Sequence, residues 1–193
     1  FRDMVEAYDE QIRGLIDGGV DAILIETCFD ALNTKAALYA LEKIDRHFPA
    51  VVSVSVNDKS GRTLTGQTLQ AFYTSVSHYP LLAFGLNCSL GADDLTPLLN
   101  EVAGFSLFPV SCYPNAGLPN EMGGYDETPE EMAESVRKMA EAGLLNIIGG
   151  CCGTTPAHIA AISAAVKGLK PRAIPEDPTG GPLTVSGLEH TSI

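Results

Sequence analysis

The sequence predicts a parallel α/β fold in which short buried strands alternate with helices. Five short apolar runs, each followed by polar residues or glycine, have the length and composition of strands covered on both faces. Segments rich in helix-forming residues separate these runs. A regular alternation of this kind specifies a parallel sheet with right-handed crossovers. The sequence contains neither a GxGxxG pattern nor a P-loop.

The first expected element is a helix over residues 2–17, where apolar side chains recur at helical spacing and two glycines follow. The strands are expected at 21–27, 50–56, 81–86, 105–112 and 144–148. The later helices are expected at about 31–46, 69–77, 92–102, 128–142 and 155–168. Thr128-Pro129-Glu130-Glu131 predicts a helix start, because it combines an N-cap threonine, a proline at the first helical position and a glutamate at the third.

Two segments fall outside this alternation. Residues 113–127 form the longest loop, crowded with proline, glycine and asparagine, and such a loop in a compact domain usually has a function. Residues 171–193 contain further prolines and glycines without periodicity, which predicts a linker. The expected organisation is therefore an α/β domain over residues 1–170 followed by a linker over residues 171–193.

The composition argues against several classes of partner. The 193 residues carry 12 basic and 24 acidic side chains, and the net charge of -12 would repel nucleic acid and anionic lipid. No apolar run approaches the ~20 residues that span a bilayer, and the first residues do not resemble a signal peptide. These features predict a cytoplasmic protein with no nucleic acid and no membrane as partner.

The cysteines point to reduced thiols, because an odd count of five in a cytosol-like sequence does not form a disulfide framework. Cys151 and Cys152 are adjacent within a glycine run at 149–153. Neighbouring side chains of a strand point to opposite faces, so both sulfurs reach one metal only if the backbone bends, which glycine permits. Cys88 ends another apolar stretch, and three cysteines with one vacant position form the open zinc site expected of a catalyst.

Other polar residues follow the expected strands, where the loops of a βα barrel gather around one pocket. They are Glu26, Asn57 and Asn115. Alternatively, Glu26 interacts with the N-terminus of the next helix, and the two asparagines are turn residues. Cys28 and Cys112 are equally interpretable as small buried apolar residues. None of the four histidines follows a strand, and all are expected on the surface: His47, His78, His158 and His190.

Four segments together carry a resemblance: IETCFDALNTKAA, GLNCSLGADDL, YPNAGLPNEMGGYDETPEEMA and NIIGGCCGTTPAHIAAI. They resemble the homocysteine-binding modules of cobalamin-dependent methionine synthases, within the wider homocysteine S-methyltransferase family. The likeness extends from about Val5 to Lys170. It implies a (β/α)8 TIM barrel of which this chain supplies about the last five βα units, so that about three units precede it in the parent chain.

The resemblance also implies roles for the candidate residues. Zinc would be bound by Cys88 of the GLNC segment together with Cys151 and Cys152 of the GGCCG segment. Glu26, in the IET segment, is similar to the residue that binds the homocysteine amino group. Asn115, in the PNAG segment, resembles a residue that takes the fourth metal position when substrate is absent.

The activity implied by the resemblance is methionine synthesis. Zinc would activate homocysteine as a thiolate for methyl transfer from methylcobalamin, and the methyl group would come originally from 5-methyltetrahydrofolate. Cobalamin and methyltetrahydrofolate would bind to other modules of the same polypeptide, and the segment PLTVSGLEH looks like the connection toward a folate-binding module. The alternatives are a betaine- or other donor-dependent homocysteine S-methyltransferase and a structural zinc or thiol-switch domain. With an incomplete barrel, the chain alone is expected to be inactive.

Overall fold

A computed structural model describes residues 1–176 and 182–193 of the chain. Its centre is a five-stranded parallel sheet with the order β1-β2-β3-β4-β5, which is also the order along the sequence. The strands are β1 Ile23–Cys28, β2 Ala50–Val54, β3 Ala83–Gly91, β4 Val110–Asn115 and β5 Ile147–Ile148. Each crossover therefore moves one position along the sheet in the same direction, as in a (β/α)8 barrel.

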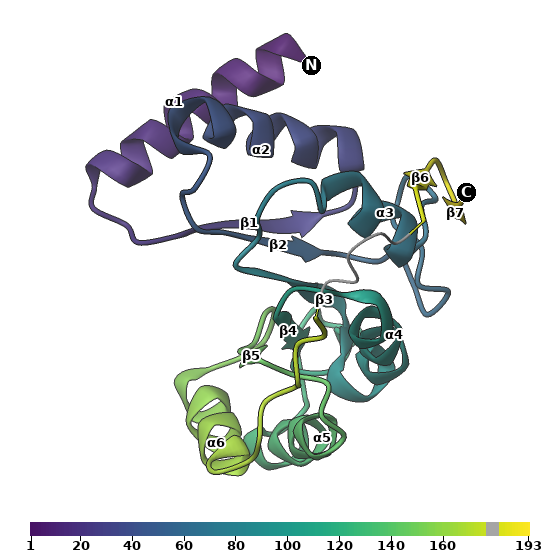
Figure 1. Cartoon of the computed structure of the whole chain (residues 1–193). Helices are drawn as coiled ribbons and strands as arrows, with labels where there is room; N and C mark the ends of the chain where they lie inside the picture. Colours follow the sequence, from purple (N-terminus) through teal and green to yellow (C-terminus); the bar gives the residue numbers. More distant parts are fainter. Residues whose placement is uncertain (177–181) are drawn as a thin grey trace.

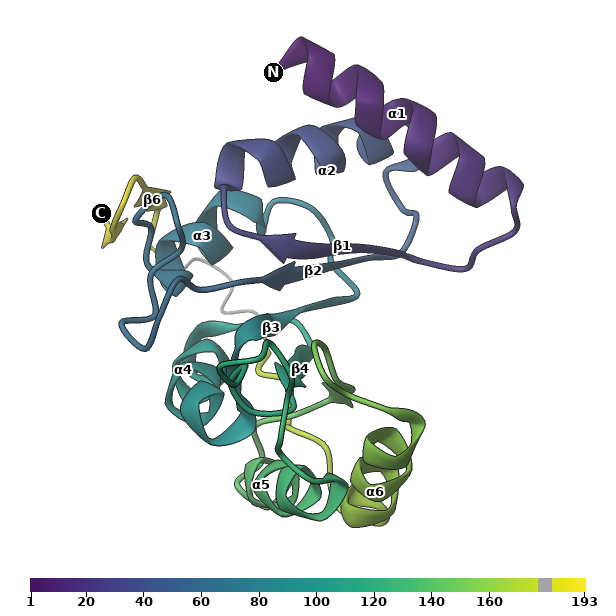
Figure 2. The ribbon, with the colours of Figure 1, turned by 180° about the vertical axis from the view of Figure 1, so that it is seen from behind.

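Six helices accompany this sheet in the described part of the chain: α1 Arg2–Asp17, α2 Ala31–Asp45, α3 Leu69–Val76, α4 Ala92–Phe105, α5 Pro129–Glu141 and α6 Pro156–Val166. Helices α1 and α2 lie beyond β1 and β2 at one end of the sheet, and α5 and α6 lie beyond β4 and β5 at the other (Figures 1 and 2). This arrangement confirms the predicted part of a barrel. None of the helices in residues 1–176 and 182–193 has the length and apolar character that a membrane crossing requires.

Side-chain caps explain why several helices begin where the sequence predicts. The Asp30 carboxylate accepts from the third N–H of α2, and the Thr68 hydroxyl accepts from the third N–H of α3. At α5, Thr128 and Glu131 form the predicted capping box, in which each side chain bonds the backbone N–H of the other. These caps fix where α2, α3 and α5 begin, and so limit the loops that follow β1, β2 and β4.

The sheet is buried tightly enough to restrict side-chain size. Every residue of β2 is buried, as expected of a strand covered on both faces. In β3, a side chain at Gly85 would place its Cβ 1.8 Å from the carbonyl oxygen of Ser111 in β4. Strand β4 begins at Val110, later than the predicted 105, because α4 continues to Phe105 and Ser106 forms a turn with Phe108.

The segment after residue 170 has more regular structure than the predicted linker. Arg172 is only 6% exposed, and its guanidinium donates to the carbonyls of Ala103, Ser106 and Phe108 at 2.6 to 3.2 Å. Two further strands, β6 Thr184–Ser186 and β7 His190–Ser192, form an antiparallel hairpin. Residues 177–181 of the predicted linker lie outside the described residues.

The hairpin packs on α3 and on the chain just before it (Figure 1). The Ser186 hydroxyl lies 2.8 Å from that of Ser75, and the Thr68 N–H donates to the Leu188 carbonyl at 3.0 Å. The predicted linker therefore contains a hairpin that the sequence reasoning did not expect. Its partners lie more than 100 positions away in the sequence, so a local pattern does not reveal them.

Candidate metal centre

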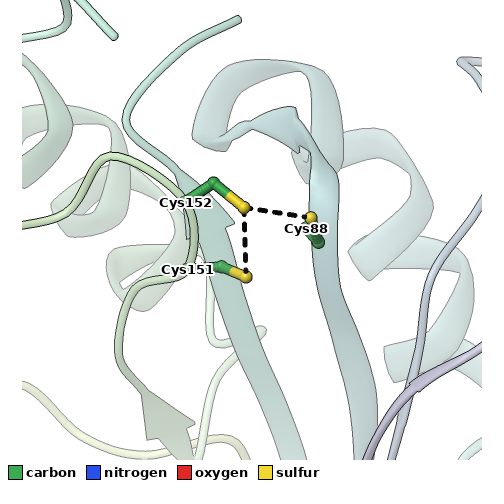
Figure 3. A group of neighbouring side chains, drawn as sticks. All are labelled: Cys88, Cys151 and Cys152. Carbon is green, nitrogen blue, oxygen red and sulfur yellow. Dashed lines mark hydrogen bonds between the residues drawn. The ribbon is translucent and has the colours of Figure 1, made fainter. Parts of the chain in front are cut away.

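Three cysteine sulfurs converge at the carboxyl ends of β3 and β5 (Figure 3). The Cys152 Sγ atom is 3.5 Å from Cys88 Sγ and 3.9 Å from Cys151 Sγ. All three sulfurs lie within 4.8 Å of one another. Among the residues that the structure describes, no other group of histidine, cysteine or acidic side chains converges in this way. Cys88 and the adjacent pair Cys151 and Cys152 thus form one cluster, as the sequence predicts.

The spacing of the sulfurs fits a tetrahedral zinc ion. With Zn–S bonds of about 2.3 Å, two sulfur ligands at the corners of a tetrahedron are about 3.8 Å apart. The distances of 3.5 Å and 3.9 Å lie on either side of this value. Thiolates are among the ligands that zinc prefers, and three protein ligands leave a fourth position for water or substrate. The donor set therefore fits an open zinc site.

Cys88 reaches the site through a bulge inside β3. The strand pairs regularly with β4 up to Asn87 and again at Gly91, and the register shifts between them. Cys88 and Ser89 have φ angles of 61° and 63°, which residues other than glycine seldom adopt. The Ser89 hydroxyl lies 2.7 Å from the Ser55 hydroxyl, which ties the bulge to the end of β2. The predicted end of this strand at residue 86 is therefore too early.

The loop after β5 is attached to the end of β4. Pairing of β5 ends at Ile148, so Cys151 and Cys152 leave the extended form, as a shared metal requires. The Cys151 N–H donates to the Pro114 carbonyl at 2.8 Å, and the Cys152 carbonyl accepts from the Ala116 N–H at 2.9 Å. These backbone bonds place both sulfurs on the side of Cys88.

Two glycines in this loop leave no room for a side chain. A Cβ at Gly150 would lie 2.4 Å from the Cγ2 atom of Thr154. Gly153 has a φ of 78°, and a Cβ there would lie 2.4 Å from the Cβ of Tyr125. The glycine run permits the bend, as predicted from the sequence, and also lets the loop pack closely against its neighbours.

The three thiols influence one another's ionisation. Burial, and secondly the proximity of Cys88, raises the pKa of the Cys151 thiol to about 12. A hydrogen bond from Cys88 lowers the pKa of the Cys152 thiol. Three thiolates this close together repel one another, so a bound cation is needed to deprotonate the whole cluster. By contrast, burial alone raises the pKa of the isolated Cys112 thiol to about 12, as suits a structural cysteine.

Asn115 lies directly beside the cysteine loop. It is the last residue of β4 rather than part of the following loop, it is 2% exposed, and its Oδ1 accepts from the Cys152 N–H at 3.1 Å. The structure therefore brings this predicted site residue to the cysteines and gives it a role in holding Cys152. Its service as a fourth metal ligand remains a prediction.

Glu26 and Asn57 have different surroundings. Glu26 is exposed at the end of β1, and no hydrogen bond to its carboxylate is found within residues 1–176 and 182–193. Together with Tyr8 and Asn33 it lines a cavity of about 240 Å³, and none of the three clustered cysteines lines that cavity. Asn57 lies in an exposed turn, where its N–H donates to the Arg62 carbonyl, in agreement with the simpler of its two interpretations.

Asn87 is a residue near the site that the sequence reasoning did not select. It is fully buried, and its side chain bonds residues at the ends of β1 and β2 and contacts Cys151. A polar residue that ends an apolar run and stands directly before Cys88 is the signal that identifies it.

His158 contradicts the prediction that the histidines are surface residues. It is 6% exposed, and its Nδ1 accepts from the Thr155 N–H at 3.2 Å. Its Nε2 therefore carries the proton and donates to the Glu127 carbonyl at 2.9 Å. His158 takes the place of glutamate in a capping box at the start of α6, a variant that the usual pattern does not include. It thereby anchors the end of the long loop at 113–127, whereas His47 and His78 are exposed, as predicted.

Comparison with known proteins agrees with this fold. Residues 1–166 match the family described as Homocysteine S-methyltransferase. The chain therefore belongs to the homocysteine S-methyltransferase family, as the sequence motifs predict. A similar solved structure is the apo form of the homocysteine methyltransferase MmuM from Escherichia coli, with a TM-score of 0.66 and 26% sequence identity. The match covers 83% of this chain and 57% of that one, so the chain spans little more than half of the length of this relative.

Proposed function

We propose that this chain is the zinc-dependent, homocysteine-binding part of a cobalamin-dependent methionine synthase. The observation that carries the proposal is the convergence of three cysteine sulfurs within 4.8 Å, in a chain of the homocysteine S-methyltransferase family. A site of three thiols with one free position suits a metal that accepts a further sulfur from a substrate. Membership of the homocysteine S-methyltransferase family supports homocysteine as that substrate.

Each cysteine has the same task in this proposal. Cys88, Cys151 and Cys152 hold the metal as thiolates, and the bonds to the end of β4 keep the last two in place. Zinc, when bound, lowers the pKa of a coordinated thiol, so the homocysteine sulfur is available as a nucleophile near neutral pH. The three cysteine thiolates carry more negative charge than the ion neutralises, which keeps the added sulfur electron-rich and reactive toward a methyl group.

Glu26 is the proposed partner of the homocysteine amino group. Its carboxylate is exposed beside a cavity of about 240 Å³ and has no bonding partner in the described ranges, so it is free to accept from an ammonium group. Asn115 acts on the metal loop through the Cys152 N–H. The substrate is thus held at two ends, by sulfur and by its amino group.

The tail favours methylcobalamin over other methyl donors. The segment PLTVSGLEH looks like the connection to a folate-binding module, and its hairpin packs on α3 rather than extending freely. In this proposal other modules of the same cytoplasmic polypeptide bind cobalamin and 5-methyltetrahydrofolate. A betaine-dependent or other single-module relative has no use for such a connection, and a purely structural zinc site would use four protein ligands.

X-ray absorption on the intact polypeptide tests the proposal. We expect one zinc per barrel with a shell of three sulfurs, which homocysteine converts to four. Methyl transfer to homocysteine should occur with methylcobalamin and not with betaine. If the sulfur ligands of zinc do not change when homocysteine is added, the site is structural. Activity with another methyl donor alone would assign the enzyme to a different branch of the family.

A further inference from the structure

The side chain of Asn87 connects the substrate end of β1 with the cysteine loop. It is completely buried at the carboxyl end of β3, the central strand of the sheet. Its Oδ1 accepts from the Ser53 hydroxyl at 2.7 Å and from the Thr27 N–H at 3.1 Å. Its Nδ2 donates to the Thr27 hydroxyl at 2.9 Å and contacts Cys151 Sγ at 4.0 Å. One amide therefore bonds or contacts groups from β1, β2 and the loop after β5.

The surroundings fix the orientation of this amide. The Thr27 backbone N–H is only a donor, so the group that faces it at 3.1 Å must be the oxygen of Asn87. The amino group then points toward the Thr27 hydroxyl and the Cys151 sulfur. An N–H directed at sulfur is the arrangement that a thiolate accepts, and it becomes more favourable as negative charge develops on the sulfur.

Thr27 is held by Asn87 in an unusual conformation. Its φ is 58°, which is costly for a β-branched residue, and the pairing of β1 with β2 shifts register between Ile25 and Cys28. The backbone N–H and the hydroxyl of Thr27 are both bonded to Asn87. Because Glu26 directly precedes Thr27, the same two bonds restrain the backbone from which the Glu26 side chain extends.

We propose that Asn87 is a positioning residue that fixes Glu26 relative to the Cys151 sulfur and donates an N–H to that sulfur when it binds metal. The inference rests on the proposed function, in which homocysteine is held by its sulfur at the metal and by its amino group at Glu26. The distance between those two points must match the length of the substrate. Asn87 bonds the end of β1, which carries Glu26, and contacts Cys151, which is one of the proposed metal ligands. It therefore contributes to selection of homocysteine by length.

Three variants of the intact polypeptide test this role after loading with cobalt(II). Asn87→Asp keeps the shape of the side chain but removes the N–H, and Asn87→Ala removes the whole amide. Ser53→Ala is the matched control, because it deletes a bond to the same Oδ1 and leaves the amino group in place. The readouts are the energy of the sulfur-to-cobalt charge-transfer band and the Kd of homocysteine, measured by titration.

We expect both Asn87 variants to shift the charge-transfer band to lower energy, because a thiolate without its hydrogen bond gives up an electron more easily. We expect their Kd for homocysteine to rise about 10- to 100-fold, as for other residues that orient metal ligands. Ser53→Ala should lower stability without moving the band or the Kd. An unchanged band and Kd in both Asn87 variants would reduce Asn87 to a structural residue and overturn the inference.

A measurement on the unaltered protein covers the case in which the Asn87 variants do not fold. With cadmium-113 in the site, an Asn87 amide proton should show scalar coupling to the metal through the Cys151 sulfur, and absence of that coupling contradicts the hydrogen bond. A wild-type protein that binds neither metal nor homocysteine would instead refute the proposed function, and this inference with it. The two failures are therefore distinguishable.

Discussion

The backbone N–H of Cys152 donates to the side-chain oxygen of Asn115 across 3.1 Å, so the last residue of β4 holds the loop after β5. Asn115 is 2% exposed and cannot easily be replaced in this role by water. The bond gives Asn115 a role in holding the cysteine loop that does not depend on its predicted service as a metal ligand.

Replacing Asn115 with alanine should therefore weaken metal binding even though all three cysteines remain. We expect the affinity for zinc to fall about 10- to 100-fold, the usual effect of removing a group that orients a metal ligand. Competition with a coloured chelator measures this affinity. Asn100→Ala, at an exposed position on α4, is the control and should bind zinc as the wild type does. If both variants bind zinc with equal affinity, Asn115 does not contribute to metal binding.

The five cysteines should separate into two groups when each is replaced by alanine. Cys88, Cys151 and Cys152 share one site, so each substitution should abolish stoichiometric zinc binding. Cys28 and Cys112 are buried away from that cluster, and their variants should keep the metal and lose only stability. Metal analysis of the purified variants gives the answer. Full zinc content in all of the first three variants would exclude the proposed ligands.

Much of the fold follows from local sequence, because most strands coincide with short apolar runs and α2, α3 and α5 begin at side-chain caps. The capping box at Thr128 shows this well, since both side chains that define it are within the first turn. The cysteine site could also be predicted from the sequence, because parallel strands of a barrel bring their carboxyl ends together whatever the details of the loops. What local pattern does not contain is the bulge at Cys88, which depends on pairing with β4 and on a bond to Ser55.

The residues that sequence reasoning missed are those whose roles depend on distant partners. Arg172 looks like a linker residue until α4 and the loop after it place three carbonyls around its guanidinium. His158 looks like a surface histidine until the end of the long loop places the Glu127 carbonyl beside it. In both cases a polar side chain is buried by segments that are distant in the sequence. The hydrophobic periodicity of the neighbouring residues therefore does not indicate the burial.

The capping box of α5 should make a contribution to stability that depends on pH. Glu131 accepts from the Thr128 N–H and hydroxyl at 2.9 Å and 2.8 Å, and the backbone bond in particular lowers the pKa of its carboxyl below the ordinary 4.5. A lowered folded pKa means that the stabilisation is fully present above pH 4.5 and is lost as the pH falls through the folded value. Glu131→Gln should therefore be less stable than the wild type at neutral pH.

In acid the difference should disappear, because the protonated glutamate then resembles glutamine. Chemical denaturation at several pH values measures it. Glu130→Gln removes a charge from the same helical turn without touching the bonds to Thr128, and is the control. A gap between wild type and Glu131→Gln that persists in strong acid would contradict the role of the ionised carboxylate.

Arg172 should be important for stability although it follows the last helix of the barrel segment. Loss of its guanidinium removes a donor from three carbonyls, of which that of Phe108 keeps a second donor, the Ser106 hydroxyl. We expect Arg172→Ala to lower the free energy of unfolding by roughly 3 kcal/mol. Arg172→Lys should recover only part of this, because an ammonium group lacks the planar fork that reaches several acceptors. Arg46→Ala, which breaks an exposed pair with Glu42, should cost less than about 1 kcal/mol. Thermal or denaturant unfolding compares the three.

The glycines of the cysteine loop should be as necessary for metal binding as the cysteines themselves. At Gly150 a methyl group meets Thr154 at 2.4 Å, and at Gly153 it meets Tyr125 at 2.4 Å with φ already at 78°. Alanine at either position must displace the loop, and a shift of about 1 Å in a metal ligand is enough to weaken the site severely. We expect zinc affinity to fall at least about tenfold in each variant. Gly14→Ala in α1, with no atom within 4 Å of the added group, should instead raise stability by about 0.5 to 1 kcal/mol and leave zinc binding unchanged. If the loop variants bind zinc like Gly14→Ala, close packing of the loop does not position the sulfurs.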